Sequence, residues 1–361
     1  MRRMQRNALG SSMRLTDLPR PKWWGFWVRL FKTVDVLIFK LLEIFKVYRP
    51  VKSIMGIPTL STPTMTSVQA VVYNGTIEEV LGFKPRRLLH KILRGVPDVE
   101  FFERVEFQVP ISGTDVRMVQ ASTETRGFIH LQLPWSTPQE TYSVSSLGMT
   151  PKGVETLVGR ISIGEYEIVP GPVFFLNDKI KWIVFSDIDD TIKDSKVGES
   201  TTFRQIVGGL FRGNYYTYDA IGGMAELYQR LVTRGAMIVY VTSTPYQLTP
   251  FLLKFLKEQR FPEGPVFPRW IGYGRFGHKW RTLSRIIGAM GGQKCLLIGD
   301  SGELDLQIYR RLYETPTFQS KIARVMIRHI PGTPVLEKRN DAEFFYDEIP
   351  EIVKEVESLI I

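Results

Sequence analysis

Two aspartates one residue apart, Asp187 and Asp189, are the residues of this 361-residue chain whose types and spacing first suggest chemistry. They follow a nearly continuous apolar run, Trp182–Ser186, which is typical of a strand buried on both faces of a sheet. In an extended chain, side chains two residues apart point the same way, so both carboxylates would converge on one site. Close carboxylates repel each other, which favours a bound cation such as Mg²⁺, and a carboxylate can also attack phosphorus. An acidic turn after a strand is the alternative interpretation of this motif taken alone.

Hydroxyl and ammonium groups follow at two later positions of the chain. The apolar run Met237–Thr242 leads into Thr242 and Ser243, whose hydroxyls could bind phosphate oxygens at a strand end. Lys279 begins a predicted helix after a Gly-rich stretch, where its ammonium could hold a phosphoryl group and offset the charge of the aspartates. Each feature alone has an ordinary explanation, because Ser and Thr begin many helices as N-caps and most lysines are solvated.

More carboxylates follow a third apolar run, Cys295–Gly299. Asp300 comes directly after this run and is placed to complete a metal site with the first two aspartates. Asp305 could act as a further ligand or orient Asp300, and Glu303 could serve in its place; the sequence leaves this choice open. The order of these groups, each at or near the end of an apolar run, is hard to obtain by accident.

Apolar runs alternate with helix-like segments from Lys181 onward, which predicts an α/β fold with an open parallel sheet. Ligands of such sheets bind at the carboxyl ends of the strands, where the polar groups above are expected. Residues 70–170 instead show short β-like runs between Gly and Pro residues, which is typical of a small, sandwich-like β-rich domain. We therefore expect a basic arm over 1–52, a Ser/Thr/Pro-rich linker over 53–69, the β-rich domain over 70–170 and the α/β domain over 171–361.

The ordered set of motifs resembles the haloacid dehalogenase (HAD) superfamily of phosphohydrolases. Asp187–Thr191 is similar to its first motif, and Thr242 and Lys279 are similar to its hydroxyl and lysine motifs. Gly299–Asp305 is similar to its last acidic motif. With their flanking residues, these segments resemble the catalytic domain of the actin-patch-type, Mg²⁺-dependent phosphatidate phosphatases. The resemblance covers roughly residues 165–335 and implies a HAD-like Rossmannoid sheet with a small β domain before it.

The resemblance implies roles for the residues of these motifs. Asp187 would be the nucleophile that forms a phospho-aspartate, and Asp189 would protonate the leaving alcohol and then activate the attacking water. Thr242, its neighbour Ser243 and the catalytic Lys279 would hold phosphoryl oxygens.

The resemblance also implies a Mg²⁺ site made of oxygen ligands. Asp187, the backbone carbonyl of Asp189 and Asp300 would hold the ion. Asp305 is the preferred last acid of this site, and Glu303 is the alternative. These ligands suit Mg²⁺ better than zinc, because no His or Cys is among them.

The charge of the chain is concentrated at one end. The formal net charge is +10, and twelve bases against three acids in residues 1–52 account for +9 of it. A nucleic-acid enzyme would more often spread basic charge along its folded cleft, so we expect no nucleic-acid partner. Residues 23–48 place their charged side chains on one arc and their apolar and aromatic side chains on the wider face, which predicts an amphipathic helix.

This arm has three interpretations. We favour a helix lying in the plane of an anionic membrane surface, because an aromatic cluster beside a polybasic tail suits that interface. The helix could instead pack on the protein itself or on a second subunit, or residues 1–20 could be an organelle transit peptide. No stretch is long and uncharged enough to span a membrane. We therefore expect a cytoplasmic protein that associates peripherally with a membrane containing phosphatidate or another anionic lipid.

Two further motifs limit the cofactors. The chain has a single cysteine, Cys295, which excludes an intramolecular disulfide or a Cys-based zinc site within one chain. Gly272–Gly277 has the form G-x-G-x-x-G, but a dinucleotide fingerprint belongs in the first strand–helix turn of its domain. Here the motif comes late and leads into Lys279, so we expect no dinucleotide cofactor.

Together these features predict a Mg²⁺-dependent phosphatase that hydrolyses phosphatidate to diacylglycerol and phosphate through a phospho-aspartate. One alternative is the same chemistry on another phosphomonoester, and a second is a non-catalytic module that binds phosphatidate. An inactive relative can dispense with the second acid of the first motif. This chain keeps both Asp187 and Asp189, together with Lys279 and Asp300, which favours an enzyme.

Overall fold

The computed structural model describes residues 51–62, 65–81, 104–112, 115–122, 128–134, 158–160, 165–169, 171–194, 219–269 and 275–360. The described residues all belong to one compact unit, residues 49–361. The predicted amphipathic helix lies outside the described residues, as do residues 272–274 of the G-x-G-x-x-G motif. No helix among the described residues is long and apolar enough to cross a membrane.

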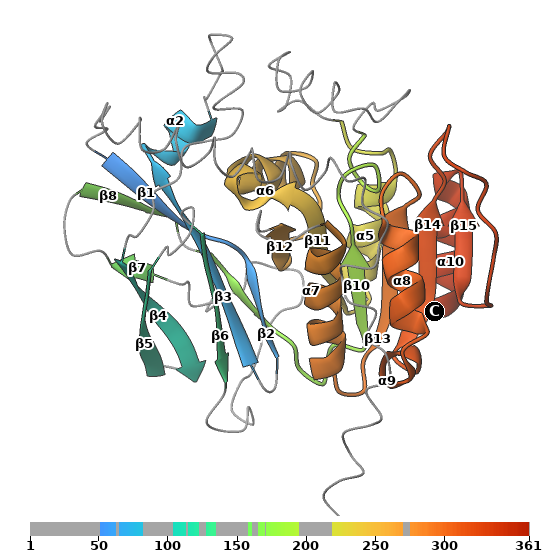
Figure 1. Cartoon of the computed structure of the whole chain (residues 1–361), viewed down its shortest axis with the longest axis horizontal. Coiled ribbons are helices and arrows are strands. Elements are labelled where there is room, and N and C mark those ends of the chain that lie inside the picture. The colour runs from blue at the N-terminus through green and yellow to red at the C-terminus, as the bar shows by residue number, and fades with distance from the viewer. Residues whose placement is uncertain are drawn as a thin grey trace, which may run out of the picture. The chain divides into compact units, whose positions relative to one another are not determined.

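A six-stranded parallel sheet forms the centre of the α/β part, as predicted (Figure 1). The strand order is β12-β11-β10-β13-β14-β15, so β10, which precedes the first aspartates, lies between the two strands that precede the hydroxyl and acidic motifs. The predicted α/β fold class is therefore confirmed. The strands are β10 (Trp182–Ser186), β11 (Ala236–Pro245), β12 (Val266–Arg269), β13 (Lys294–Asp300), β14 (Ile322–Arg328) and β15 (Glu343–Tyr346).

Both faces of this sheet are buried, which explains why its strands are almost continuously apolar. Within β10, Val184 belongs to the core cluster on one face, whereas Ile183 and Phe185 belong to the cluster on the other. Helices α7 and α8 cover the near face in Figure 1, and α5 and α10 cover the far face. The helices are α5 (Met224–Thr233), α6 (Thr249–Glu258), α7 (Arg275–Ala289), α8 (Asp305–Tyr313), α9 (Pro316–Gln319) and α10 (Ile349–Ile360), with a 3₁₀ turn η1 (Tyr246–Leu248) before α6.

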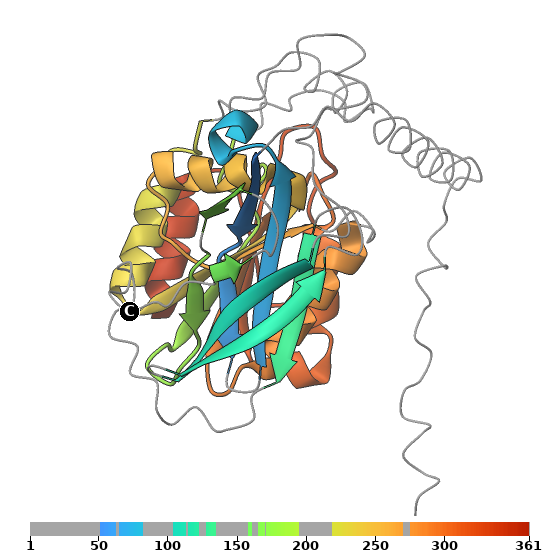
Figure 2. The same ribbon diagram turned by 90° about the vertical axis from the view of Figure 1, so that its left-hand side faces the viewer.

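The region before the α/β part is β-rich, as predicted. A six-stranded sheet has the order β8-β1-β3-β2-β9, with β6 also paired to β3, and a three-stranded sheet has the order β5-β4-β7. Figure 2 shows the three-stranded sheet in front of the larger one. The elements are β1 (Val51–Gly56), β2 (Thr59–Thr62), β3 (Met65–Asn74), α2 (Ile77–Leu81), β4 (Arg104–Ser112), β5 (Asp115–Ser122), β6 (Phe128–Pro134), β7 (Val158–Arg160), β8 (Glu165–Val169) and β9 (Val173–Phe175).

The predicted linker over 53–69 is wrong, because these residues form strands β1, β2 and the start of β3. Their hydroxyls are buried and hydrogen-bonded rather than solvated. Thr59 Oγ1 donates to Ser67 O at 2.7 Å, and Ser61 Oγ lies 2.8 Å from Thr66 Oγ1. The Ser/Thr content that suggests a linker is therefore the polar part of a buried sheet, since buried hydroxyls are tolerated when they are paired. The sheet also extends past 170, because β9 belongs to it.

The β-rich sheet supports the α/β part through hydrogen bonds to its backbone. Val266 N donates to Pro58 O at 2.8 Å, and Gln69 Nε2 donates to Val266 O at 3.2 Å. Tyr73 Oη donates to Tyr246 O at 3.3 Å, just after the hydroxyl motif at the end of β11. The β-rich region thus fixes β12 and the 3₁₀ turn that follows the motif.

Candidate active site

The polar residues predicted at strand ends lie at one edge of the parallel sheet, because its strands all run in the same direction. Asp187 continues the ladder of β10, since its N–H donates to Ile298 O at 2.9 Å. Asp190 then adopts a left-handed conformation with φ of 59°, which turns the chain. Arg328 Nη1, at the end of β14, donates to the carbonyl of Asp190 at 2.9 Å and holds this turn.

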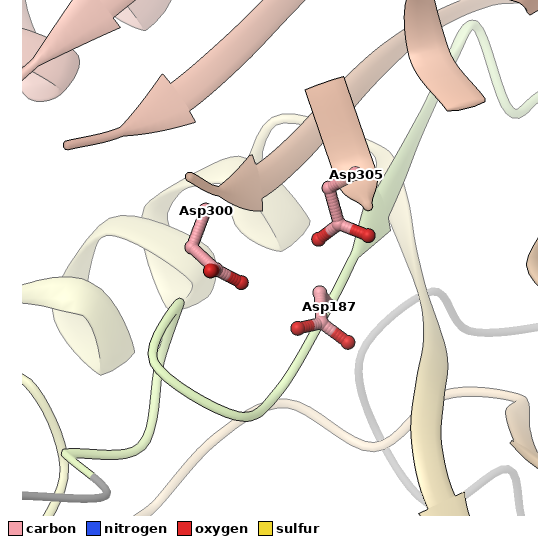
Figure 3. Close-up of side chains that lie close together, drawn as sticks. All are labelled: Asp187, Asp300 and Asp305. Carbon is pink, nitrogen blue, oxygen red and sulfur yellow. The ribbon is translucent and has the colours of Figure 1, made fainter. Parts of the chain in front are cut away.

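Three aspartate side chains converge in this turn region (Figure 3). Asp187, Asp300 and Asp305 each offer a carboxylate oxygen within 4.8 Å of the others, and all three side chains are buried. They come from three elements: the end of β10, the end of β13 and the start of α8. The sequence predicted Asp305 or Glu303 as the last acid, and of the two it is Asp305 that lies in this group.

Lys279 lies against the same group from the first turns of α7. Its Nζ is 2.9 Å from Asp187 Oδ1 and 2.5 Å from Asp305 Oδ1, but 3.6 Å from Glu303 Oε2. Burial lowers the pKa of this lysine, yet the charges of Asp187 and Asp305 outweigh burial and raise it well above its usual value. Lys279 is therefore a fixed, buried cation.

One ammonium does not balance three buried carboxylates. Burial, opposed by Lys279, raises the pKa of Asp187 well above its usual range, with the neighbouring acids raising it further. Burial and then Asp305 raise the pKa of Asp300 to about 8, and burial also raises that of Asp305. Asp187 Oδ2 and Asp305 Oδ2 are buried and accept no hydrogen bond from the described residues. Buried carboxylate oxygens that accept no hydrogen bond could serve as ligands of a hard cation, which would supply the missing positive charge.

The loop after β13 is shaped around Asp300. Gly302 N and Glu303 N donate to Asp300 Oδ1 at 2.6 and 3.2 Å, and Thr191 Oγ1 donates to Oδ2 at 3.4 Å. Gly299 is required by close packing, because a Cβ there would lie 2.4 Å from Asp305 Oδ2. The glycine lets the carboxylate of Asp305 approach the strand end.

The carboxylate of Asp189 does not belong to the three-aspartate group. Its Oδ1 lies 2.5 Å from Lys193 Nζ, and its Oδ2 accepts from Thr244 Oγ1 at 2.6 Å and from Thr242 Oγ1 at 3.4 Å. Burial raises the pKa of Asp189, but Lys193 and Thr244 outweigh burial and lower it below the usual value. Lys193 and Thr244 thus hold the carboxylate of Asp189 outside the group formed by Asp187, Asp300 and Asp305.

The hydroxyl motif lies beside these acids at the end of β11. Thr242 is fully buried, and its Oγ1 also accepts from Thr244 N at 3.0 Å. Ser243 is 7% exposed, and its Oγ has no hydrogen-bond partner among the described residues. Of the two predicted phosphate-binding hydroxyls, the one on Thr242 therefore lies at Asp189, whereas the one on Ser243 is buried without a hydrogen-bond partner among the described residues.

The sequence did not single out Lys193 or Thr244. Lys193 is four residues after Asp189, and Thr244 is two residues after Thr242. Such spacings are common, and only the turn at Asp190 and the course of β11 bring both side chains to one carboxylate. The sequence signal for Lys193 and Thr244 was only that each is a polar residue close to a predicted site motif.

Comparison with known proteins supports the sequence resemblance. Residues 182–329 match the family described as phosphatidate phosphatase APP1, catalytic domain. The resemblance to this family is confirmed. The matched range contains the three grouped aspartates, Asp189 and Lys279.

An uncharacterized protein of Schizosaccharomyces pombe is 27% identical to the chain over 188 residues. The match covers 47% of this chain and 29% of that protein, so the chain spans less than a third of the relative's length.

Two solved structures share a weaker likeness. The class C acid phosphatase from Bacillus anthracis with tungstate bound is 16% identical, with a TM-score of 0.28 over 40% of this chain and 65% of that one. A putative β-phosphoglucomutase from Thermotoga maritima is 14% identical, with a TM-score of 0.31 over 50% of this chain and 100% of that one. At TM-scores this low, neither structure supports a conclusion about the chain.

Proposed function

We propose that this protein is a Mg²⁺-dependent phosphatidate phosphatase that releases phosphate and diacylglycerol through a phospho-aspartate. The observation that carries this proposal is the group of three buried aspartates beside the buried Lys279, within the range that matches the phosphatidate phosphatase family. A buried acid cluster with a fixed cation suits phosphoryl transfer, because catalysis of that reaction is largely positioning and charge stabilisation.

Asp187 is the proposed nucleophile. One of its carboxylate oxygens attacks phosphorus, a new phosphorus–oxygen bond forms, and the bond from phosphorus to the glycerol oxygen breaks. Asp187 suits this role because it is held at a strand end by the ladder bond to Ile298, and its Oδ2 accepts no hydrogen bond from the described residues. Lys279 Nζ, 2.9 Å from its Oδ1, favours the ionised form that attacks.

Asp189 is the proposed general acid and base. A negatively charged phosphoryl group bound beside Asp189 would raise the pKa of its carboxyl, so Asp189 would take up a proton when the substrate binds. It then gives this proton to the departing glycerol oxygen, so diacylglycerol leaves as a neutral alcohol. The resulting carboxylate then takes a proton from water, whose oxygen attacks phosphorus, breaks the phospho-aspartate and releases phosphate. Its separate position supports this division, because Asp189 is held by Lys193 and Thr244 rather than by the three-aspartate group.

A divalent cation fits the donor set of this site. The candidate ligands are the carboxylates of Asp187, Asp300 and Asp305, to which the resemblance adds the backbone carbonyl of Asp189. All are hard oxygens, which suits Mg²⁺ better than zinc. When bound, such an ion would neutralise negative charge on the phosphoryl group and on the acids.

The remaining hydrogen-bond donors of the site are proposed to bind the phosphoryl oxygens of the substrate. Lys279 Nζ lies at Asp187 and the Thr242 hydroxyl lies at Asp189, while the neighbouring Ser243 hydroxyl is without a partner among the described residues. These groups would hold the phosphomonoester in line with Asp187.

The substrate and partner follow from the resemblance and from the basic arm. Residues 1–52 carry a net +9, which would draw the protein to an anionic membrane surface where phosphatidate is present. We therefore propose a cytoplasmic enzyme that binds membranes peripherally through this arm.

Phosphate release tests the proposal. The full chain should release phosphate from phosphatidate vesicles with Mg²⁺ present, and exhaustive chelation should remove that activity. Activity on soluble phosphomonoesters with none on phosphatidate would overturn the substrate. Binding of phosphatidate vesicles without any phosphate release, at every divalent ion tried, would instead identify a non-catalytic binding module.

A further inference from the structure

We propose that Lys193 and Thr244 are positioning residues that hold the carboxylate of Asp189 for proton transfer to the leaving alcohol. This inference rests on the proposed function, in which Asp189 is the general acid. It assigns a role to two side chains that lie outside the three-aspartate group and outside the predicted phosphate-binding residues.

The two residues hold the carboxylate from opposite oxygens. Lys193 Nζ lies 2.5 Å from Oδ1, and Thr244 Oγ1 donates to Oδ2 at 2.6 Å. Charge-assisted hydrogen bonds of this length are the strong ones, and two of them fix both the position and the plane of a carboxylate. Thr242 Oγ1, at 3.4 Å from Oδ2, adds a weaker contact on the same side.

Lys193 is itself held in place by its backbone. Its N–H donates to Ile188 O at 3.0 Å, and its carbonyl accepts from Asp190 N at 2.9 Å. It forms β-bridges with both Asp189 and Ala220, so its strand position is fixed on two sides. With 12% of its side chain exposed, it is far more buried than the usual surface lysine.

Thr244 is fixed by the end of β11. Its N–H donates to Thr242 Oγ1 at 3.0 Å, and Arg269 Nε donates to the adjacent carbonyl of Ser243 at 2.8 Å. Both contacts restrain the backbone that carries the hydroxyl. Lys193 and Thr244 therefore come from two rigid segments, 51 residues apart in sequence, that meet at one carboxylate.

This arrangement matters for one step of the reaction. Without Lys193 and Thr244, the Asp189 carboxylate could rotate toward the three other aspartates or toward solvent, and proton transfer needs hydrogen-bond distance to the leaving oxygen. An ester whose leaving group departs without a proton should not need this positioning. A glycerol alkoxide needs the proton, whereas nitrophenolate is a stable anion and does not.

The experiment compares kcat/KM on two water-soluble esters, dioctanoyl phosphatidate and p-nitrophenyl phosphate, with Mg²⁺ in the full chain. The ratio kcat/KM reports the steps up to phospho-aspartate formation, so it isolates departure of the alcohol. For Lys193→Met, the value for the phosphatidate should fall roughly tenfold or more, because general acid help is typically about 10²–10⁴-fold. The value for the aryl ester should stay within about threefold, because that step needs no acid. Lys193→Arg should recover part of the loss.

Matched variants control for charge and folding. Lys254→Met removes an exposed lysine from a comparable i,i+4 pair with Glu258 and should change neither value. If Lys193→Met does not fold, Thr244→Val carries the same test against Thr244→Ser, which keeps the hydroxyl. Equal losses on both esters, or no loss on either, would overturn the positioning role. A wild-type chain that cleaves neither ester would overturn the proposed function, and this inference with it.

Discussion

At the scale of single residues, the site is defined by an imbalance of charge. Three carboxylates and one ammonium are buried together, and the acids raise one another's pKa while Lys279 opposes them. Isolated buried charges are too costly to persist without partners, so the cluster is completed either by protons or by a cation. The aspartates of this site could be predicted from the sequence, because they follow apolar runs that end at the same sheet edge, and Lys279 could be predicted from its place after a Gly-rich stretch.

Asp187→Asn tests the nucleophile. The amide keeps the size of the side chain but cannot attack phosphorus, so turnover should fall by roughly four orders of magnitude or more. Circular dichroism and thermal unfolding should show an intact fold. Asp178→Asn, which changes an exposed aspartate nine residues earlier, should keep full activity. Retention of most phosphatase activity by Asp187→Asn would assign the nucleophile elsewhere.

Cation binding should release protons near neutral pH. The pKa of Asp300 is raised to about 8 by burial and by Asp305, so without a cation this group is largely protonated at pH 7. A bound cation requires the carboxylate, so its affinity should rise as pH rises toward 8, by up to about tenfold per pH unit below that value. Calorimetry of Mg²⁺ binding in two buffers with different ionisation enthalpies measures the released protons.

Asp300→Asn is the control for that release, because it removes the titrating group and should lower both the affinity and the proton count. A Mg²⁺ affinity that stays constant from pH 6 to pH 9 would contradict the linkage.

At the scale of elements, the sequence predicts best the parallel strands, whose apolar pattern recurs along the chain. The parallel strands carry long apolar runs because both of their faces are buried, so both the fold class and the strand ends could be predicted. The strands over 53–69 could not be predicted, because a segment rich in Ser and Thr is typical of a solvated linker. Only the hydrogen-bond partners of these hydroxyls show that they are buried in a sheet. Asp305 could not be separated from Glu303 either, because the choice depends on where α8 begins.

Gly299→Ala tests how the end of β13 and the start of α8 fit together. The added Cβ would lie 2.4 Å from Asp305 Oδ2 and 2.7 Å from Asp305 Cβ, so Asp305 must move out of the three-aspartate group. Overpacking of this kind costs about 1–3 kcal/mol, and Mg²⁺ binding should weaken together with stability. Thermal unfolding and calorimetry measure the two effects.

Gly288→Ala, in helix α7, is the matched control. A Cβ there would have its nearest neighbour, Phe318 Cε1, at an ordinary 3.8 Å, and alanine favours a helix over glycine. Stability should stay equal or rise, and Mg²⁺ affinity should be unchanged. An unchanged Mg²⁺ affinity in Gly299→Ala would show that the approach of Asp305 to the strand end is not required.

At the scale of the whole molecule, charge and chemistry are carried by different parts of the chain. Residues 1–52 hold +9 of the net +10, which leaves the remaining residues close to neutral. The site lies entirely within residues 182–329, and the β-rich sheet supports it from residues that the sequence alone assigned to a linker. Val51 already belongs to β1, so a truncation that removes the arm must stop before this strand. Substitutions in the full chain avoid that problem.

The final prediction concerns membrane binding by the arm. Replacing Arg2, Arg3, Arg6 and Arg14 with Gln in the full chain should weaken binding to anionic vesicles by roughly 10³-fold, since each base near the surface contributes about 1 kcal/mol. Phosphate release from phosphatidate vesicles should fall with binding, whereas kcat/KM on dioctanoyl phosphatidate should not change. The deficit on vesicles should shrink as salt rises, because screening weakens the wild-type attraction too.

The matched control replaces the exposed Lys179, Lys254, Lys257 and Lys338 with Gln. It removes the same charge from the body of the protein and should have a much smaller effect on vesicle binding. Equal loss of vesicle binding in both variants would show that net charge rather than the arm governs association, and equal binding by all three proteins would favour a helix packed on the protein itself.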